Sequence, residues 1–512
     1  MKSSKIDIKK DHVKGKEVAL LFGTFVIAIC GLVYQLLEST LSSYLLGDSI
    51  YHFSLIIGLF MSSMGIGAWL SRFIEHNLER AFVLLQMCIA LIGGFSAFML
   101  FYAFAYIGNY EAFLYLITIL LGSMLGIEIP LIIRIMQKSF SLKTNISNVF
   151  TVDYIGALFA ALLFPLVLVP QLGLMQTSFL FGGLNLMVGS MAWFIFKNTL
   201  GKKHLIPLVL IAVVLVAGFV QSNSLTSLIE NKLYKNNIIY SKQTPYQKLI
   251  VTANNGRTQF YINGAIQFDS IDEHRYHESL VHPVMHMAMR HENVLIIGGG
   301  DGMALREVLK YADVAHITLV DLDPAITTLF KTHPALSKLN QHAYENDKIT
   351  VVNMDAWKFI EKLNTLYDVI IIDLPAPNNI SLSRLYSQTF YRLLATHLSR
   401  SGAMVTQATS PMFSRDAFWC IEETMSESGL ITLPYHTYIP SFGEWGFVLA
   451  SKLKLPLREI EETKAFKYID NQAMKRMQIF DKDISKTEVK SNRLSSHKLI
   501  YYYDSGWEKW YE

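Results

Sequence analysis

The chain has 512 residues, enough for two or three domains, and 51% of them are hydrophobic while 17% are charged. The net charge of +3 is too small to indicate a nucleic-acid-binding surface. Three cysteines, Cys30, Cys88 and Cys420, provide neither a disulfide framework nor the spacing of metal ligands. The averages hide a division near residue 222, where long apolar segments give way to short segments of ordinary charge density.

The first 221 residues predict a multi-pass helical membrane domain. About twenty consecutive apolar residues are needed to cross a bilayer as a helix. After a basic N-terminal arm, residues 1–17, the range 18–221 contains seven such segments: 18–39, 52–71, 81–104, 113–135, 149–171, 176–196 and 204–221. The first lies too deep, and is followed by too many others, to be a cleaved signal peptide.

Positive charges alternate between the loops that connect these segments. The N-terminal arm and the second, fourth and sixth loops carry lysine or arginine, whereas the first, third and fifth loops have none. The positive-inside rule therefore predicts a cytoplasmic N-terminus in a multi-pass protein of the plasma membrane.

Three acids, Glu38, Glu128 and Asp153, lie in or beside the apolar segments. Ionisable side chains at membrane depth usually face the interior of a helix bundle and often mark a functional site. Placement at the membrane interface, or hydrogen bonding between helices, would explain them equally well, so their role stays open.

A polar linker, residues 222–236, precedes a small β-subdomain at 237–290. Its β-type runs are NIIYSK, KLIVTA, TQFYING and AIQF. Between them, NNG (254–256) and NG (263–264) are strong hairpin signals, because these residues accept positive φ. The sequence therefore predicts an antiparallel meander.

Residues 291–512 alternate strand-like and helix-like segments and end in a helical tail. The strands are NVLIIG, HITLVD, KITVVN, YDVIIID and AMVTQAT, followed by a late pair around EWGFVLAS. Such alternation is typical of a Rossmann-like α/β domain with a parallel sheet covered by helices. Ligands on these sheets bind outside the carboxyl ends of the strands.

Four acids, Asp301, Asp321, Asp355 and Asp373, lie at these strand ends. Gly298 and Gly300 fit a nucleotide-binding turn, but Met303 replaces the third glycine of the dinucleotide pattern. Asp301 inside the turn would repel a pyrophosphate and attract a cation. The acids therefore predict a nucleoside with a positive sulfonium group, S-adenosylmethionine or its decarboxylated form, although some of them could instead cap helices.

Several long motifs carry a resemblance to a known family. They include TPYQKLIVT, DEHRYHESLVHP, VLIIGGGDGMALREVL, YDVIIIDLPAPN and YIPSFGEWGFVLAS, in order between Gln243 and Ser451. This half resembles the polyamine aminopropyltransferases, the spermidine synthase family. The first half, with YQLLESTLSSYLLGDS and DYIGALFAALLFP, resembles the membrane-attached branch of that family.

The resemblance implies transfer of a 3-aminopropyl group from decarboxylated S-adenosylmethionine to an amine such as putrescine, giving spermidine and methylthioadenosine. It implies no metal and no nucleic acid, and a homodimer is a possible assembly. By resemblance Asp373 is the base for the attacking amine. The cofactor side comprises Gln247, Gly298, Gly300, Asp301, Asp321, Asp355 and Ala356. The amine side comprises Gln267, Tyr276, His277, Glu278, Ala376, Tyr438 and Glu444.

Ala376 departs from the family pattern, which has a second acid three residues after the base. That acid helps to hold the diamine. Three explanations stay open: the acceptor is not putrescine, the enzyme is weak or inactive, or the alanine is an engineered change.

The sequence leaves two other functions open. One is an amine N-methyltransferase that uses intact S-adenosylmethionine, which Asp301 disfavours because it would face the additional carboxylate. The other is a polyamine-binding or transport protein with the membrane acids along a cation path. A conflict also stays open, because seven crossings from a cytoplasmic N-terminus put the second half outside the cell, whereas the cofactor is cytosolic.

Overall fold

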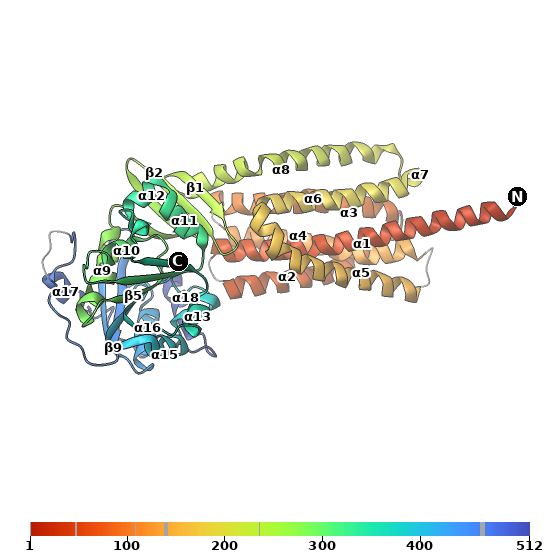
Figure 1. Ribbon diagram of the computed structural model, residues 1–512. Coiled ribbons are helices and arrows are strands. Elements are labelled where there is room, and N and C mark those ends of the chain that lie inside the picture. Colours follow the sequence, from red (N-terminus) through yellow and green to blue (C-terminus); the bar gives the residue numbers. More distant parts are fainter. Residues whose placement is uncertain are drawn as a thin grey trace. The chain divides into compact units, whose positions relative to one another are not determined.

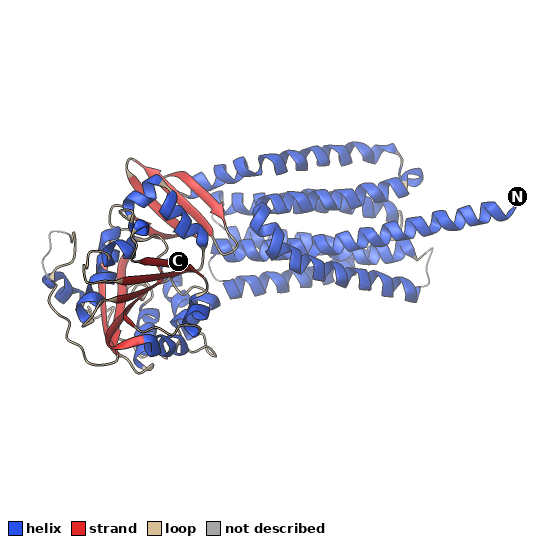
Figure 2. Ribbon diagram, viewed as in Figure 1, coloured by secondary structure: helices blue, strands red, loops and turns tan. Residues whose placement is uncertain are grey.

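The computed structural model describes residues 2–46, 49–107, 109–137, 142–234, 236–460 and 466–511. The chain divides into two compact units, Met1–Asn236 and Asn237–Glu512. Figure 2 shows that the first unit is helical and that the strands belong to the second.

The first unit is a bundle of long helices (Figure 1). They are α1 (Lys2–Leu46), α2 (Ser49–Leu70), α3 (Leu78–Tyr106), α4 (Tyr110–Met136), α5 (Leu142–Leu163), α6 (Val169–Ile195) and α8 (Leu205–Leu233), with a short α7 (Lys197–Leu200). By length and composition, the described residues contain 6 helical stretches apolar enough to cross a membrane. The fifth stretch, Leu142–Ile195, contains both the fifth and the sixth predicted segments.

This fifth stretch has 54 residues. A straight helix of that length would measure about 80 Å, whereas the apolar core of a bilayer is about 30 Å thick. Proline occurs at positions 165 and 170, and the backbone of Gly173 leaves helical geometry with φ 72° and ψ 178°. The stretch therefore consists of two legs, α5 and α6, which are separate in Figure 1.

Helix α8 continues beyond the last predicted apolar segment. It ends at Leu233, so most of the predicted linker at 222–236 is helical. The apolar stretch that contains most of this helix, Lys202–Ile229, is 28 residues long and begins in the short 3₁₀ helix Lys202–His204.

The second unit begins with the predicted antiparallel meander. Its strands β1 (Asn237–Gln243), β2 (Lys248–Asn254), β3 (Arg257–Ile262) and β4 (Ala265–Asp269) pair in chain order. Both predicted hairpins are confirmed, since Asn254 pairs with Arg257 and Ile262 pairs with Ala265. Their turn residues have the positive φ angles that asparagine and glycine tolerate.

A seven-stranded sheet forms the centre of the second unit, with the order β10-β11-β9-β8-β5-β6-β7. The predicted parallel part is confirmed and comprises β5 (Asn293–Gly298), β6 (His316–Asp321), β7 (Ile349–Asn353), β8 (Tyr367–Asp373) and β9 (Leu398–Gln407). The late pair is β10 (Ile431–Ile439) and β11 (Gly443–Ser451), which add antiparallel.

Helices cover both faces of this sheet. Alternate residues of each strand point to opposite faces, and since both sets are apolar, both faces must be buried. Val294 and Ile296 of β5 pack in one core with helices α9 (Glu273–Met287), α10 (Met303–Val308) and α11 (Pro324–Thr332). Leu295 and Ile297 pack in the other core with α13 (Ala356–Glu361), α15 (Gln388–His397) and α16 (Arg415–Ser426). The helices α17 (Asn471–Met477) and α18 (Lys498–Tyr511) complete the tail.

Strands β5 and β8 are neighbours in the sheet, but β5 leads to β6 on one side and β8 leads to β9 on the other. This reversal is the topological switch point at which open α/β sheets bind ligands. Gly298, the last residue of β5, pairs with Asp373, the last residue of β8. A Cβ atom on Gly298 would lie 2.1 Å from the Asp373 carbonyl oxygen, so this close approach requires glycine.

Substitution of Gly298 by alanine is expected to destabilise the second unit. It adds a steric clash to a backbone conformation with φ 81°, so the free energy of unfolding should fall by roughly 2–5 kcal/mol. Gly256→Ala is the matched control, because φ is 80° but nothing lies within 4 Å of the new Cβ. Thermal unfolding of the full-length protein in detergent compares the two, and equal losses would contradict the close-approach explanation.

Candidate active site

Asp373 and Tyr276 form a hydrogen-bonded pair at the switch point. The Tyr276 hydroxyl, carried by α9, donates to Asp373 Oδ1 at 2.6 Å. Burial raises the pKa of Asp373 to about 6, and the negative charge of Asp301 adds to the effect. The positive charge of His277 and the Tyr276 hydrogen bond oppose that rise. A carboxylate with such a pKa can accept a proton near neutral pH.

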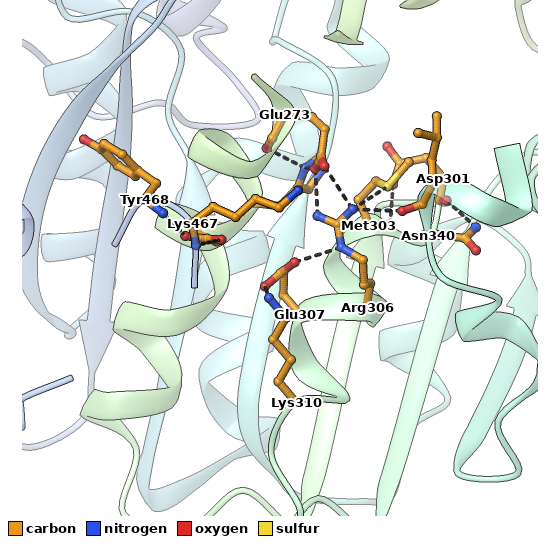
Figure 3. Close-up of polar contacts among 12 residues, drawn as sticks. Glu273, Asp301, Met303, Arg306, Glu307, Lys310, Asn340, Lys467 and Tyr468 are labelled. Carbon is orange, nitrogen blue, oxygen red and sulfur yellow. Dashed lines mark hydrogen bonds and ion pairs between the residues drawn. The ribbon is translucent and has the colours of Figure 1, made fainter. Parts of the chain in front are cut away.

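Asp301 lies in the glycine-rich loop between β5 and α10. Its Oδ1 accepts a hydrogen bond from the Met303 amide at 2.8 Å, and its carbonyl oxygen accepts one from Asn340 at 3.0 Å (Figure 3). Burial raises the pKa of Asp301, while the positive charge of His277 opposes the rise. The loop therefore presents a second buried acid beside Asp373.

Asp321, the last residue of β6, is hydrogen-bonded to the same glycine-rich loop. Its carboxylate accepts hydrogen bonds from the Gly300 amide at 3.1 Å and from the Asp323 amide at 2.9 Å. A Cβ atom at Gly300 would lie 2.5 Å from Asp321 Oδ2, so the approach needs glycine here too. Burial raises the pKa of Asp321 to about 7, although both amide hydrogen bonds oppose the rise.

A buried ion network supplies positive charge next to these acids. Glu273 accepts two hydrogen bonds from the Arg306 guanidinium, at 2.9 and 2.8 Å, and its Oε2 lies 2.8 Å from His277 Nδ1. Burial opposes ionisation, but His277 and Arg306 lower the pKa of Glu273 to about 2. Burial likewise opposes the charged imidazole, yet Glu273 raises the pKa of His277 to about 9. His277 is therefore a cation at neutral pH.

Arg306 is held by a second carboxylate as well. It donates to Glu307 at 2.8 Å, and Glu307 also contacts Lys310 at 2.6 Å (Figure 3). A third partner of Glu307 is His282, at 3.0 Å. Sequence reasoning assigned no role to Glu273, Arg306 or Glu307. Their signal was present, because charged residues inside the otherwise buried helices α9 and α10 need partners.

Gln247, predicted on the cofactor side, lies in the turn between β1 and β2. Its amide donates to Asp323 at 3.2 Å, beside the Thr244 hydroxyl at 2.7 Å. Asp323 also caps α11 through the Ala325 amide at 3.0 Å. Asp323 is a residue that sequence reasoning missed, although the pattern LVDLDP displays it.

Asp355 and Ala356 begin helix α13. One Asp355 oxygen caps the helix by accepting from the Lys358 amide at 3.2 Å, and the other pairs with the Arg384 guanidinium. The helix-cap alternative thus holds for Asp355. Its predicted contact with the cofactor stays a prediction.

Not all amine-side predictions meet at Asp373. Glu278 accepts three hydrogen bonds from the backbone amides of residues 467–469, at 2.8 to 3.0 Å, so its carboxylate fastens the tail to α9. Gln267 donates to the Ala265 carbonyl at 3.1 Å. Glu444 lies 2.5 Å from His436, and the Tyr438 side chain is exposed. The substrate contacts of these four residues stay predictions.

Two buried side chains donate hydrogen bonds to the backbone of the loop that contains Ala376. The Tyr386 hydroxyl donates to the Pro375 carbonyl at 3.0 Å, and the Gln407 amide donates to the Leu374 carbonyl at 2.7 Å. Ala376 itself is half-buried. Tyr386 and Gln407 lie 11 and 33 residues beyond the carbonyl groups that they bind, and no motif in the sequence linked them to the loop.

Substitution of Glu273 by glutamine tests the role of the ion network. Without the carboxylate, His277 is less often protonated, so the Asp373 pKa should rise. The base must be deprotonated to act, and the acidic limb of kcat/KM should therefore move upward by about one pH unit.

Asp313→Asn is the matched control for Glu273→Gln. Asp313 forms a similar pair with His291, at 2.7 Å, but lies on the exposed side before β6 begins. Its pH profile should equal that of the unsubstituted protein. An unchanged limb in Glu273→Gln, or an equal shift in Asp313→Asn, would contradict the network's role.

Comparisons with known proteins agree with this geometry. Residues 273–462 match the family described as "Spermine/spermidine synthase domain". The polyamine aminopropyltransferase of Leptospira interrogans is 42% identical, covering 96% of this chain and 99% of its own. Polyamine aminopropyltransferase 1 of Ralstonia nicotianae is 41% identical, covering 98% of each chain.

Among solved structures, spermidine synthase in complex with the transition-state analogue AdoDATO aligns with 48% of this chain and 84% of its own, at 25% identity and a TM-score of 0.43. The relatives match this chain along nearly its whole length, through both the helical unit and the Rossmann-like unit. The chain therefore belongs to the polyamine aminopropyltransferase family.

Proposed function

We propose that this chain is a membrane-attached aminopropyltransferase that moves a 3-aminopropyl group from decarboxylated S-adenosylmethionine to a short diamine such as putrescine. The products are spermidine and methylthioadenosine. The observation that carries the proposal is the hydrogen-bonded pair of the half-buried Asp373 and the buried Tyr276 at the switch point, with the acid Asp301 beside it.

The chemistry of the pair fits transfer to an amine. A protonated amine has no lone pair, so Asp373 first accepts one proton from it. The nitrogen lone pair then attacks the carbon next to the sulfonium sulfur. The C–N bond forms as the C–S bond breaks, and the bonding electrons stay on sulfur, so the leaving group is a neutral thioether. Positioning of the two substrates supplies much of the rate.

The charges of the crevice favour this reaction over N-methylation. Both substrates of aminopropyl transfer are cations, and Asp301, Asp321 and Asp373 give them a buried acidic wall. Intact S-adenosylmethionine carries an additional carboxylate, which these acids would repel. The decarboxylated form, with an ammonium group alone at that end of the molecule, suits Asp301.

Attachment to the membrane is supported by the first unit. Six described helical stretches reach mean hydropathies of 1.8 to 2.5, and several carry large apolar side chains that are exposed, among them Leu166, Ile206 and Val220. Such surfaces are unfavourable in water and favourable in lipid. Alternating loop charge supports a cytoplasmic N-terminus.

Replacement of Asp373 by asparagine should lower turnover by about two orders of magnitude or more while the fold persists, because general base catalysis contributes roughly that much. Asp368→Asn is the matched control. It makes the same change at the other end of β8, where Asp368 accepts a hydrogen bond from the Asn293 amide at 3.2 Å. Turnover of putrescine by the purified variants checks this. Near-normal turnover in Asp373→Asn would show that Asp373 is not the general base.

Replacement of Ala376 by aspartate tests whether the crevice is a diamine site that lacks one of its carboxylates. A charge-assisted hydrogen bond contributes about 1.5–3 kcal/mol, or roughly ten- to a hundredfold in affinity. The KM for putrescine should fall at least several-fold, with a smaller effect on the cofactor.

Ala376→Asn is the control for Ala376→Asp, since it adds similar volume without charge. Initial rates with putrescine, cadaverine and spermidine compare the variants. If aspartate improves none of these acceptors, the natural acceptor is not a short diamine held at this position.

A further inference from the structure

Helices α1 and α4 enclose an acid that the transfer reaction does not use. Glu38 of α1 is fully buried in the first unit, with 0% of its surface exposed. Among the residues that the structure describes, neither of its carboxylate oxygens has a hydrogen-bond partner. A buried carboxylate without a partner is strongly unfavourable as a bare charge, so something must neutralise it.

The side chains around Glu38 offer oxygen atoms and no positive charge. Ser42 follows Glu38 by one turn on the same face of α1. From α4, the Thr118 hydroxyl interacts with the Glu38 carboxylate without reaching the distance and angle of a full hydrogen bond, and Tyr110 lies near enough to interact with it electrostatically. No lysine, arginine or histidine of the described chain has such an interaction with Glu38.

These neighbours are themselves buried and unpartnered. Ser42 and Thr118 are 0% exposed and Tyr110 is 6% exposed. Within the described ranges, the hydroxyl oxygen of each also has no hydrogen-bond partner. Glu38 and Thr118 thus lie together between α1 and α4, with Ser42 one turn along α1 and Tyr110 within electrostatic reach, and all four have unused capacity to bind a ligand.

Glu128, the other buried acid of the bundle, differs from Glu38. It accepts a hydrogen bond from the Gln86 amide at 2.5 Å, which satisfies one of its two oxygens. Gln86 thereby gives Glu128 a protein partner that Glu38 lacks. The helix–helix hydrogen bond considered from the sequence is present at Glu128, so the ligand argument applies to Glu38.

We propose that Glu38, together with the hydroxyl groups of Ser42, Tyr110 and Thr118, binds a monovalent cation, H⁺ or Na⁺, inside the helical unit. Oxygen ligands suit hard cations. A single carboxylate among neutral hydroxyl groups balances one positive charge. A divalent ion would therefore leave one positive charge unbalanced in an apolar bundle. The helical unit is then a cation-sensing or cation-exchanging part of the molecule as well as its anchor.

Ligand binding to the folded state raises the unfolding midpoint, and this linkage provides the test. Full-length protein in lipid nanodiscs is unfolded thermally in Na⁺ or in choline at equal ionic strength, over a series of pH values. Three proteins are compared: unsubstituted, Glu38→Gln and Glu111→Gln. Glu111 lies exposed in the first turn of α4, so it is the matched control for the same chemical change.

The proposal predicts that the unsubstituted protein and Glu111→Gln share a dependence of the unfolding midpoint on Na⁺ or on pH that Glu38→Gln lacks. Dependence on Na⁺ at fixed pH identifies Na⁺ as the ligand, and dependence on pH alone identifies the proton. If Glu38→Gln responds to Na⁺ and pH as the unsubstituted protein does, the site does not exist. The helical circular-dichroism signal of Glu38→Gln, which should equal that of the unsubstituted protein, reports that the helical unit is folded.

If Glu38→Gln does not fold, labelling of the unsubstituted protein decides. Dicyclohexylcarbodiimide adds to protonated carboxyl groups in apolar sites, and mass spectrometry locates the product. The proposal predicts modification of Glu38 that Na⁺ or alkaline pH suppresses. Absence of modification at every pH, or modification that neither condition changes, overturns it.

Discussion

Mutual repulsion among buried carboxylates is the constraint on which the catalytic half depends. Asp301, Asp321 and Asp373 come together because the carboxyl ends of β5, β6 and β8 meet at the switch point. Two glycines let the loop approach so closely that a Cβ atom would collide with Asp373 or Asp321. Burial and neighbouring charge then raise the pKa values of all three acids.

The protein offsets part of this repulsion from within. Arg306 keeps Glu273 ionised, and Glu273 keeps His277 protonated beside Asp301 and Asp373, so a cation is built into the wall of the crevice. The remaining negative charge can be balanced by cationic substrates. This division of charge explains why the site favours a sulfonium nucleoside and an amine, and why an anionic dinucleotide fits it poorly.

Local patterns predicted the parts of the fold that depend on neighbouring residues. The turns at 254–256 and 263–264 specified both hairpins, and the apolar runs that end in Asp321 and Asp373 specified the strands whose ends carry the acids. The ion network was not predicted, because Glu273 and Arg306 are 33 residues apart and meet through packing of α9 on α10.

Contacts between distant parts of the chain were also missed at Asp355, and details of the helices were missed in the first unit. Asp355 was expected to face a nucleoside, but the structure also shows its pairing with Arg384, which begins the 3₁₀ helix Arg384–Tyr386. In the helical unit, hydropathy located the apolar segments and left Gly173 in the gap between the fifth and the sixth, but it did not reveal the π-helical turn Phe164–Leu168 within the fifth. It also did not reveal that α8 extends to Leu233, because a polar helix surface and a polar linker have the same composition.

Product analysis of the purified full-length protein tests the central claim most directly. The protein is incubated with putrescine and either decarboxylated or intact S-adenosylmethionine, and the products are identified by mass spectrometry. The account predicts spermidine and methylthioadenosine in equal amounts from the decarboxylated form and no methylated amine from the intact form. Methylputrescine from intact S-adenosylmethionine, or no transfer to any diamine from the decarboxylated form, would contradict it.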